Sequence, residues 1–262
     1  MTSYPFQRAL ITGASSGIGE GMAEILGEAG VAVVLVARRS NRLQSLADRF
    51  SGFEVLTADL NESKGLESVA ERIGSSTDPI DLVVNNAGFG SSGMFHDLDA
   101  DRLHDEIGLN IQALTRLSHA AMQTMIPRRR GFLLNVSSMA SFQPAPKLAV
   151  YAATKAYVTN LTESLHEEAR GTGVHVTALC PGLTKTEFQQ VSNSGDYSSK
   201  YPSFAWTSVD QVARAGLDDV AAGRALSIPG ALYKTMAVVT GVTPRTITRH
   251  LSRLVQRTSA DQ

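Results

Sequence analysis

Short apolar runs alternate with longer amphipathic stretches along the chain from Arg8 to about Ile228. This alternation is typical of strands joined by crossover helices in a parallel sheet. Because helices cover both faces of such a sheet, its strands should be apolar almost without interruption. The pattern predicts a doubly wound α/β fold with about seven strands, at Ala9–Thr12, Val31–Ala37, Glu54–Thr57, Leu82–Asn85, Phe132–Ser137, Val174–Leu179 and Ala225–Ile228.

A single domain is expected over residues 1–262, because no internal repeat, low-complexity segment or linker rich in Pro and Gly interrupts the chain. Two segments depart from the alternating pattern. Residues from about 185 to 207 mix polar and aromatic side chains without a sustained period, which indicates a lid over a substrate site. Residues from about 230 to 257 are expected to form a helical extension.

Composition and charge exclude several classes of protein. The chain of 262 residues is 43% hydrophobic, enough to bury a continuous core, and its net charge of -1 provides no basic field for nucleic acid. The longest apolar stretch, Val31–Ala37, is too short to span a bilayer. The only cysteine, Cys180, is expected to be a buried thiol in a soluble cytoplasmic protein. The histidines show no metal-ligand spacing, and the acidic residues are interpreted as helix-surface charges.

A glycine-rich turn follows the first predicted strand and precedes a helical pattern. Its three glycines let the backbone turn tightly and approach a pyrophosphate, and the helix N-terminus offers unpaired amides to anionic oxygens. A capping turn without a ligand is the alternative, which the order of strand, turn and helix disfavours. We therefore predict a dinucleotide site in a Rossmann-like sheet, formed by Gly13, Ser15, Ser16, Gly17, Ile18 and Gly19.

Further motifs follow this turn in a fixed order. They are Asn86, Ala87 and Gly88 after the fourth strand, Asn110 in the next helix, Ser138 after the fifth strand, Tyr151 and Lys155 opening a helix, and Pro181 with Gly182 after the sixth strand. Together with the GxxxGxG spacing of the turn, this set resembles the short-chain dehydrogenase/reductase family. The resemblance covers about residues 6–230 and implies an oxidoreductase that transfers a hydride between a nicotinamide and a carbonyl or alcohol carbon.

Tyr151 and Lys155 are four residues apart, so on a helix their side chains share one face. A neighbouring ammonium and a nicotinamide cation would lower the tyrosine pKa from about 10 toward neutrality, so that the phenol can exchange a proton. Ser138 can hydrogen-bond the substrate oxygen; adjacent Ser137 competes for this role, and the family's spacing selects Ser138. The resemblance also implies that Lys155 binds the nicotinamide ribose and that Asn110 holds a water relay.

The end of the second strand favours NADP(H) as the cofactor. Ala37 stands where many NAD-binding relatives carry an acidic residue, and Arg38 can offer donors to a 2′-phosphate, followed by Arg39. The alternative is that both arginines are merely solvated. The resemblance assigns Asp59 to the adenine, Asn86 to the adenosine side, and Thr184 and Thr186 to the nicotinamide or phosphates.

The predicted pocket is mostly apolar, which suits a ketone, a steroid-like molecule or an acyl chain. Its lining is expected to include Phe89, Met94, Phe95, Phe142, Pro144, Pro146 and Phe188. The segment 227–257 resembles the ketoacyl-reductase and mycolate-reductase-like branch, which implies reduction of long-chain 3-oxoacyl substrates. The alternatives are NADP-dependent oxidation of a steroid-like alcohol and a catalytically silent NADPH-sensing regulatory protein.

Two partner surfaces are expected. Members of the family form homodimers or homotetramers through helices that correspond to residues 101–125 and 150–170, so the resemblance implies a homo-oligomer. Arginines recur every four residues at 245, 249, 253 and 257, which predicts a basic amphipathic helix. That helix packs on its own domain, on a neighbouring subunit or, in the third interpretation, on a membrane surface.

Overall fold

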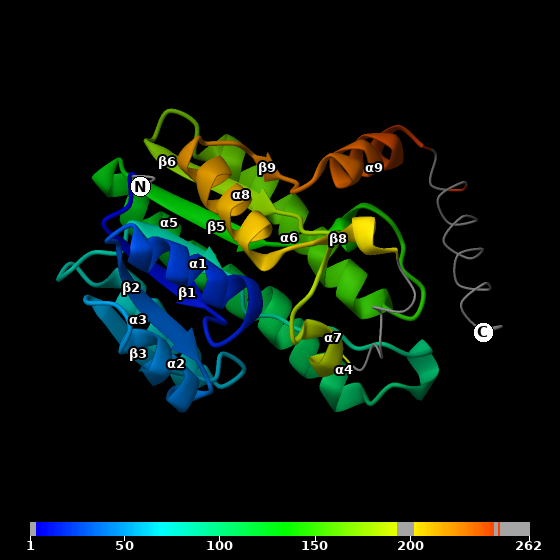
Figure 1. Cartoon of the computed structure of the whole chain (residues 1–262), viewed down its shortest axis with the longest axis horizontal. Helices are drawn as coiled ribbons and strands as arrows, with labels where there is room; N and C mark the ends of the chain where they lie inside the picture. Colours follow the sequence, from blue (N-terminus) through cyan, green and yellow to red (C-terminus); the bar gives the residue numbers. More distant parts are fainter. Residues whose placement is uncertain (1–3, 193–201, 244–245, 247–262) are drawn as a thin grey trace.

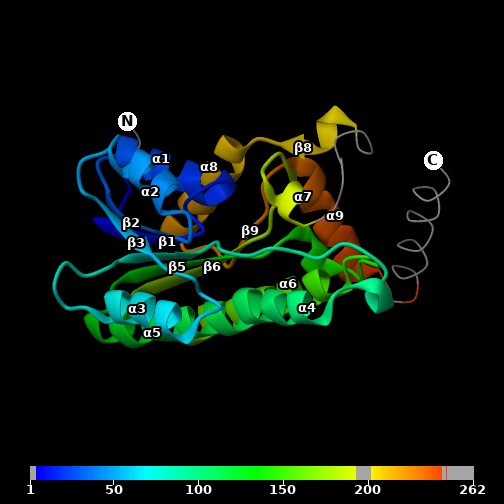
Figure 2. The same cartoon turned by 90° about the horizontal axis from the view of Figure 1, so that it is seen from below.

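A seven-stranded parallel sheet lies between two layers of helices in the computed structural model, which describes residues 4–192, 202–243 and 246 (Figure 1). One layer contains α1, α2 and α8, and the other contains α3, α5 and α6 (Figure 2). The helices are α1 (Gly17–Glu28), α2 (Ser40–Ala47), α3 (Ser63–Gly74), α4 (Ala100–Ile107), α5 (Leu114–Arg128), α6 (Ala149–Glu168), α7 (Phe188–Val191), α8 (Val209–Ala221) and α9 (Ala231–Val242).

The strand order is β3-β2-β1-β4-β5-β6-β9, and each neighbouring pair is parallel. The order reverses between β1 and β4, and ligands of such sheets bind beyond the carboxyl ends of the strands at this point. The predicted doubly wound fold is confirmed. The strands are β1 (Arg8–Thr12), β2 (Ala32–Ala37), β3 (Phe53–Thr57), β4 (Leu82–Asn85), β5 (Gly131–Val136), β6 (Val174–Leu179) and β9 (Leu226–Ser227).

The second strand shows why these runs are apolar on both faces. Val33 and Leu35 point into the core beneath α1, α2 and α8, whereas Val34 and Val36 point into the core beneath α3 and α5. All four side chains are fully buried. Alternation between two cores, rather than between core and water, therefore explains the absence of polar positions in this strand.

The segment interpreted as a lid contains regular structure that the sequence pattern did not predict. A second, parallel sheet of two strands is formed by β7 (Leu183–Thr184), just before the segment, and β8 (Trp206–Thr207), at its end. Tyr233 from α9 fastens this sheet, because its hydroxyl donates to the Ala205 carbonyl at 2.5 Å and accepts from the Leu183 amide at 3.0 Å. The lid function itself stays a prediction.

The predicted C-terminal extension is described only as far as α9 and residue 246. The recurring arginines at 245, 249, 253 and 257 lie outside the described residues, as do Tyr197 and Tyr201 of the lid segment. Over the part of the chain that is described, no helix is both long and apolar enough to cross a membrane. Cys180 is buried as expected, and burial raises the pKa of its thiol to about 11.

A buried polar network joins the two central strands to the helices behind them. The Asn85 amide donates to Asn135 Oδ1 at 2.9 Å and to Ser118 Oγ at 3.1 Å. The Asn135 amide donates in turn to Thr162 Oγ1 at 3.0 Å. Because none of the four side chains is more than 3% exposed, the network holds β4, β5, α5 and α6 in one register where water cannot substitute for a lost partner.

Replacing the central member of this network tests its contribution to stability. We expect Asn135→Leu to lower the free energy of unfolding by about 2 to 4 kcal/mol, because Asn85 and Thr162 each lose a buried partner. Urea unfolding measures the change, and Asn41→Leu, at an exposed position of α2, is the matched control. A loss for Asn135→Leu no larger than that of the control would contradict the interpretation.

Candidate active site

The glycine-rich turn that follows β1 packs closely against the residues that follow β4. Gly13 and Gly17 have φ of 67° and 59°, which side chains disfavour, and a Cβ on Gly13 would lie 2.8 Å from the Asn86 amide nitrogen. Asn86 Nδ2 donates to the Thr12 carbonyl at 3.0 Å, and the backbone amides of Asn86 and Ala87 both donate to Thr12 Oγ1 at 3.0 Å. Asn86 thus fixes the shape of the turn.

The N-terminus of α1 meets the requirements of an anion site. Its N-cap residue, Ser16, makes no capping hydrogen bond through its side chain, so the first amides of the helix remain available for a ligand. Gly19 packs so closely that a Cβ there would lie 2.6 Å from the Gly13 carbonyl oxygen. The helix therefore starts directly behind the turn, as a phosphate cradle requires.

The two arginines after β2 have different surroundings. Arg39 donates to the Ser15 hydroxyl at 2.9 Å and to the Ser16 hydroxyl at 2.8 Å, so its guanidinium lies on the glycine-rich turn. The Arg38 side chain is 73% exposed and, among the described residues, pairs only with Asp59, at 3.5 Å. Arg39 therefore lies against the glycine-rich turn, whereas Arg38 projects away from it; the phosphate role predicted for Arg38 stays a prediction.

Tyr151 and Lys155 lie together on the first turns of α6, at the carboxyl end of β5. The Lys155 ammonium donates to the Val136 carbonyl at 2.8 Å and stands 5.8 Å from the centre of the Tyr151 ring. Both residues are buried, and the Tyr151 ring also packs against Phe188 of α7 at 5.2 Å between ring centres. The structure therefore brings together the phenol and the ammonium that the sequence pairs.

Burial moves the pKa values of this pair in opposite directions. Removal from water lowers the pKa of Lys155 to about 8, because the charged ammonium is the form that loses hydration. The same effect raises the pKa of Tyr151 to about 12, although a hydrogen bond with Ser138 acts in the lowering direction. From the sequence we predicted that an ammonium together with a nicotinamide cation would lower the phenol pKa. Among the chain's own groups, the raising effect of burial on this pKa exceeds the lowering effect of Ser138.

The two adjacent serines differ in their hydrogen-bond partners. Ser137 is buried, with its hydroxyl hydrogen-bonded to the Lys155 carbonyl at 2.8 Å and to the Thr159 hydroxyl at 2.6 Å. Ser138 accepts from the Ala140 amide at 3.1 Å, and its hydroxyl lies near enough to Tyr151 to act on the pKa of the phenol in the lowering direction. Of the two, Ser138 is therefore the one that can act on the same substrate oxygen as the phenol, as the family's spacing predicts.

Asn110 lies in a short π-helix, Gly108–Ala113, between α4 and α5. Its side chain donates to the Phe89 carbonyl at 2.8 Å and to the Thr154 hydroxyl at 3.1 Å, and accepts from the Phe89 amide at 3.2 Å. A Cβ on Gly88 would lie 2.8 Å from Asn110 Oδ1 and 3.4 Å from Lys155 Nζ. Gly88 therefore leaves Asn110 next to Lys155; the proposed water relay stays a prediction.

The segment after β6 runs from the carboxyl end of that strand to the glycine-rich turn. Pro181 accepts from the Met139 amide at 2.9 Å, and Gly182 faces Tyr233 so closely that any Cβ would overlap its ring. Thr184 hydrogen-bonds Thr207, while the Thr186 side chain covers Gly17, 3.1 Å from where a Cβ would be. Thr186 is thus placed at the turn, whereas Thr184 belongs to the small sheet.

The expected apolar pocket lining divides into two groups. Phe188 packs on Tyr151 and therefore borders the site, whereas the Phe89 ring lies 5.0 Å from the Arg102 guanidinium. Met94 and Phe95, by contrast, are 51% and 63% exposed. Residues after the fourth strand therefore contribute less apolar surface to this pocket than their composition indicates.

Sequence reasoning missed Glu106, which is fully buried on α4. Neither of its carboxylate oxygens has a hydrogen-bond partner in the part of the chain described here. Desolvation raises the pKa of Glu106, against smaller lowering effects of Ser91, Arg102 and Lys155. The acidic residues of predicted helices were interpreted as surface charges, and the missed signal is that Glu106 lies one turn before Asn110, on the same helix face.

Substituting Glu106 should change how stability depends on pH. Because its folded-state pKa lies above the ordinary value of 4.5, Glu106 contributes stability below pH 4.5 that is lost as pH rises through the raised pKa. We therefore expect Glu106→Gln to be more stable relative to the wild type at pH 8 than at pH 4.5. Thermal unfolding at the two pH values measures this, with Glu67→Gln, from an exposed ion pair, as control. A difference independent of pH would contradict it.

The sequence of the chain is similar to a known family and to individual proteins of that family. A model of the short chain dehydrogenase family matches residues 7–196. An uncharacterized oxidoreductase of Staphylococcus epidermidis is 32% identical over 72% of this chain and 82% of its own length, and one of Staphylococcus aureus is 32% identical over 77% and 88%.

Two solved structures share both sequence and architecture with the chain. One is a short-chain dehydrogenase from Sphingobium yanoikuyae in complex with NADPH, with a TM-score of 0.80 and 32% identity over 91% of this chain and 96% of that one. The other is the bulky-bulky ketone specific alcohol dehydrogenase from Comamonas testosteroni, with a TM-score of 0.76 and 30% identity over 91% and 95%.

Proposed function

The chain belongs to the short-chain dehydrogenase/reductase family, and from this premise we propose that it is an NADP(H)-dependent oxidoreductase that reduces an apolar ketone or a 3-oxoacyl substrate. The observation that carries the proposal is the meeting of Tyr151, Lys155 and Ser138 at the carboxyl edge of the sheet. The glycine-rich turn lies along the same edge, beyond the end of β1. A nicotinamide cofactor bound there would lie beside the phenol.

The groups along this edge fit a phosphorylated dinucleotide. The free amides at the start of α1 suit a pyrophosphate, and Arg39 with the Ser15 and Ser16 hydroxyls suits a phosphate on the adenosine ribose. Lys155, which keeps two further donors beside its bond to Val136, would bind ribose hydroxyls near the nicotinamide. When bound, the nicotinamide supplies or accepts the hydride. The NADPH complex of the Sphingobium relative supports this choice of cofactor.

The residues of α6 would then move the proton. With its pKa raised to about 12, the Tyr151 phenol is protonated at neutral pH and can donate to the substrate oxygen as the hydride reaches the adjacent carbon. Ser138 hydrogen-bonds that oxygen and stabilises its developing charge. Lys155, whose pKa is lowered to about 8, then returns a proton to the phenolate. The protonated phenol is the form of Tyr151 that reduction of a carbonyl requires.

Aromatic side chains beside Tyr151 support an apolar substrate. Phe188 covers the phenol ring, so a carbonyl that reaches Tyr151 must pass apolar surface. The ketone named for the Comamonas relative is consistent with this. A steroid-like alcohol substrate is the alternative within the enzyme class. A catalytically silent NADPH sensor is disfavoured, because Ser138, Tyr151 and Lys155 are all present.

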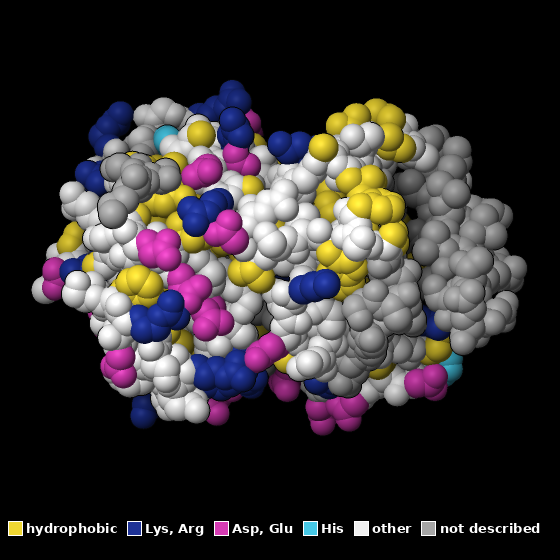
Figure 3. Space-filling model, viewed as in Figure 1, with side chains coloured by type: hydrophobic (Ala, Val, Ile, Leu, Met, Phe, Trp, Pro, Cys, Tyr) yellow, Lys and Arg dark blue, Asp and Glu magenta, His cyan; other side chains and the backbone are white. Residues whose placement is uncertain are grey.

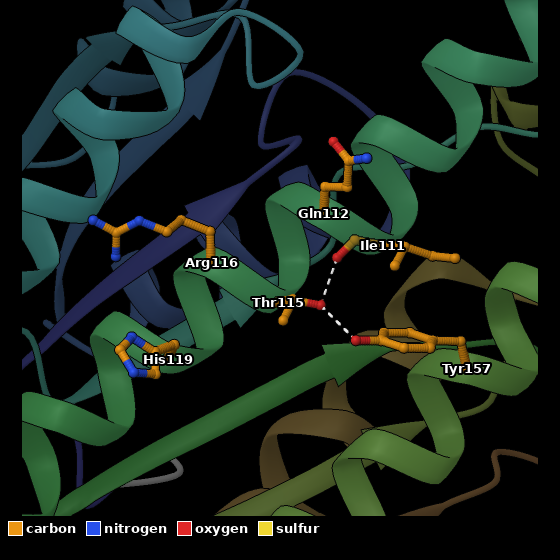
Figure 4. A pocket seen from close by; sticks show the side chains of 6 residues that line it. All are labelled: Ile111, Gln112, Thr115, Arg116, His119 and Tyr157. Carbon is orange, nitrogen blue, oxygen red and sulfur yellow. Dashed lines mark hydrogen bonds between the residues drawn. The ribbon is translucent and has the colours of Figure 1, made fainter.

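Helices α5 and α6 supply the surface for self-association in this proposal. A surface hollow of about 440 Å³ lies between them, lined by Ile111, Gln112, Thr115, Arg116, His119 and Tyr157 (Figure 4). Thr115 joins the two helices at its floor, because its hydroxyl donates to the Ile111 carbonyl at 2.7 Å and is 2.9 Å from the Tyr157 hydroxyl. Matching helices of a second copy would fill the hollow, giving a homodimer or homotetramer.

Contact with a lipid surface would involve the C-terminal region. Hydrophobic side chains gather over α9 (Figure 3), where Leu232, Met236 and Val239 follow one another at helical spacing and are 42%, 42% and 54% exposed. This exposed face precedes the sequence that carries the recurring arginines. An exposed apolar helix face followed in the sequence by recurring arginines supports a peripheral membrane contact.

Removal of the phenolic hydroxyl tests the catalytic assignment. We expect Tyr151→Phe to lower kcat for NADPH-dependent ketone reduction by about 100- to 10,000-fold, because the general acid is lost. The Kd for NADPH should stay near the wild-type value, since the ring still packs under Phe188. Tyr4→Phe, remote from the site, is the control. A Tyr151→Phe variant with near-normal kcat would refute the mechanism.

A comparison of the two arginines tests the cofactor assignment. We expect Arg39→Met to weaken NADPH binding by about 10- to 100-fold, as for loss of charge-assisted hydrogen bonds, with little effect on NADH. Arg38→Met should have a smaller effect, because that side chain projects into solvent. Fluorescence titration with both coenzymes measures the four affinities. A larger loss of NADPH affinity for Arg38→Met would reverse the assignment.

A further inference from the structure

Glu187 links the segment after β6 to the arginines beside the glycine-rich turn. One of its carboxylate oxygens accepts from Arg39 at 2.8 Å and the other accepts from Arg42 at 2.7 Å. These two arginines hold the pKa of Glu187 below its ordinary value. The carboxylate is therefore charged at neutral pH and bridges two cations that belong to α2 and its N-cap.

Arg39 is shared between this carboxylate and the turn. Its Nη1 faces Glu187, while its Nη2 faces the Ser15 and Ser16 hydroxyls at 2.9 Å and 2.8 Å. A guanidinium forms its strongest contacts with a planar or tetrahedral anion through two nitrogens at once. A phosphate held by Arg39 and the two serines would therefore compete with Glu187 for the same fork of donors.

We propose that Glu187 is a specificity-determining residue whose carboxylate competes with the 2′-phosphate of NADP(H) for Arg39. The inference rests on the proposed function, since it takes the phosphate to bind at Arg39. NADH carries no 2′-phosphate and leaves both ion pairs of Glu187 intact, whereas the 2′-phosphate of NADPH must displace the pair with Arg39. Glu187 therefore lowers the affinity for NADPH relative to that for NADH.

The same competition connects the cofactor to the reaction centre. Phe188, next to Glu187 in the chain, packs on the Tyr151 ring, and Arg102 holds the other end of α7 through the Val191 carbonyl at 2.6 Å. The ion pairs of Glu187 thus fix the N-terminal end of α7, near the phenol. A 2′-phosphate that takes Arg39 leaves this end held through Arg42 alone, so the attachment of α7 beside Tyr151 is weaker with NADPH bound than with NADH bound.

Coenzyme affinities of a neutral variant test the competition. We expect Glu187→Gln to bind NADPH about two- to fivefold more tightly than the wild type, the range expected from loss of one competing exposed ion pair with Arg39, with NADH affinity unchanged. Fluorescence titration at low salt provides the Kd values. Glu24→Gln is the matched control, because it removes one charge from an ion pair with Arg49 close to the same helices and should alter neither Kd.

The only tryptophan provides a second readout that does not depend on turnover. Trp206 lies on β8, which pairs with the strand leading into the Glu187 segment, and Lys185 is 5.9 Å from its ring centre. Adenosine 2′,5′-bisphosphate should change Trp206 emission in the wild type and much less in Glu187→Gln. Adenosine 5′-monophosphate, which lacks the 2′-phosphate, should change it in neither protein.

The outcomes separate this inference from the proposed function. Weaker or unchanged NADPH binding by Glu187→Gln, or an equal change for NADH, overturns the role of Glu187. If Arg39→Met weakens NADPH binding in the same assay, only this inference has failed. If neither NADPH nor adenosine 2′,5′-bisphosphate binds the wild-type chain, the cofactor assignment has failed as well.

Discussion

The hydrogen bond from the Lys155 ammonium to the Val136 carbonyl is the contact on which the site depends. It fixes the first turns of α6 to the carboxyl end of β5, and the Ser137 hydroxyl adds a second link to the Lys155 carbonyl. Tyr151 lies one helical turn earlier, so these bonds determine that the phenol faces Ser138. If α6 rotated on the sheet by one residue, phenol and serine would separate and the ammonium would lose its partner.

A parallel sheet makes such an arrangement predictable from sequence. Its strands end at one edge, so the residues that follow Thr12, Asn85, Val136 and Leu179 must meet there, however distant they are in the chain. Short, mostly apolar runs between amphipathic stretches identified all seven strands, and the glycine spacing identified the turn after the first. Local patterns therefore sufficed for the fold and for the order of the candidate site residues.

Local patterns did not suffice where tertiary contacts determine a side chain's surroundings. Arg38 and Arg39 are equivalent in sequence, and only the approach of Ser15 and Glu187 distinguishes Arg39. The pKa of Tyr151 depends on enclosure by Phe188, which comes from a segment without periodicity. Glu106 looks like any acidic residue of an amphipathic helix until the packing of α4 shows that it is buried. In each case the decisive partner is distant in sequence.

The site concentrates ionisable groups that folding would otherwise leave in water. Burial of Lys155, Tyr151 and Glu106 opposes stability but places proton donors and acceptors where no solvent competes. The most direct test of this account is a crystal structure of the protein with NADP⁺ bound. In that structure we expect the nicotinamide to lie beside Tyr151, a ribose hydroxyl to be hydrogen-bonded to Lys155 and the 2′-phosphate to lie on Arg39. A coenzyme bound away from Tyr151 and Lys155 would contradict it.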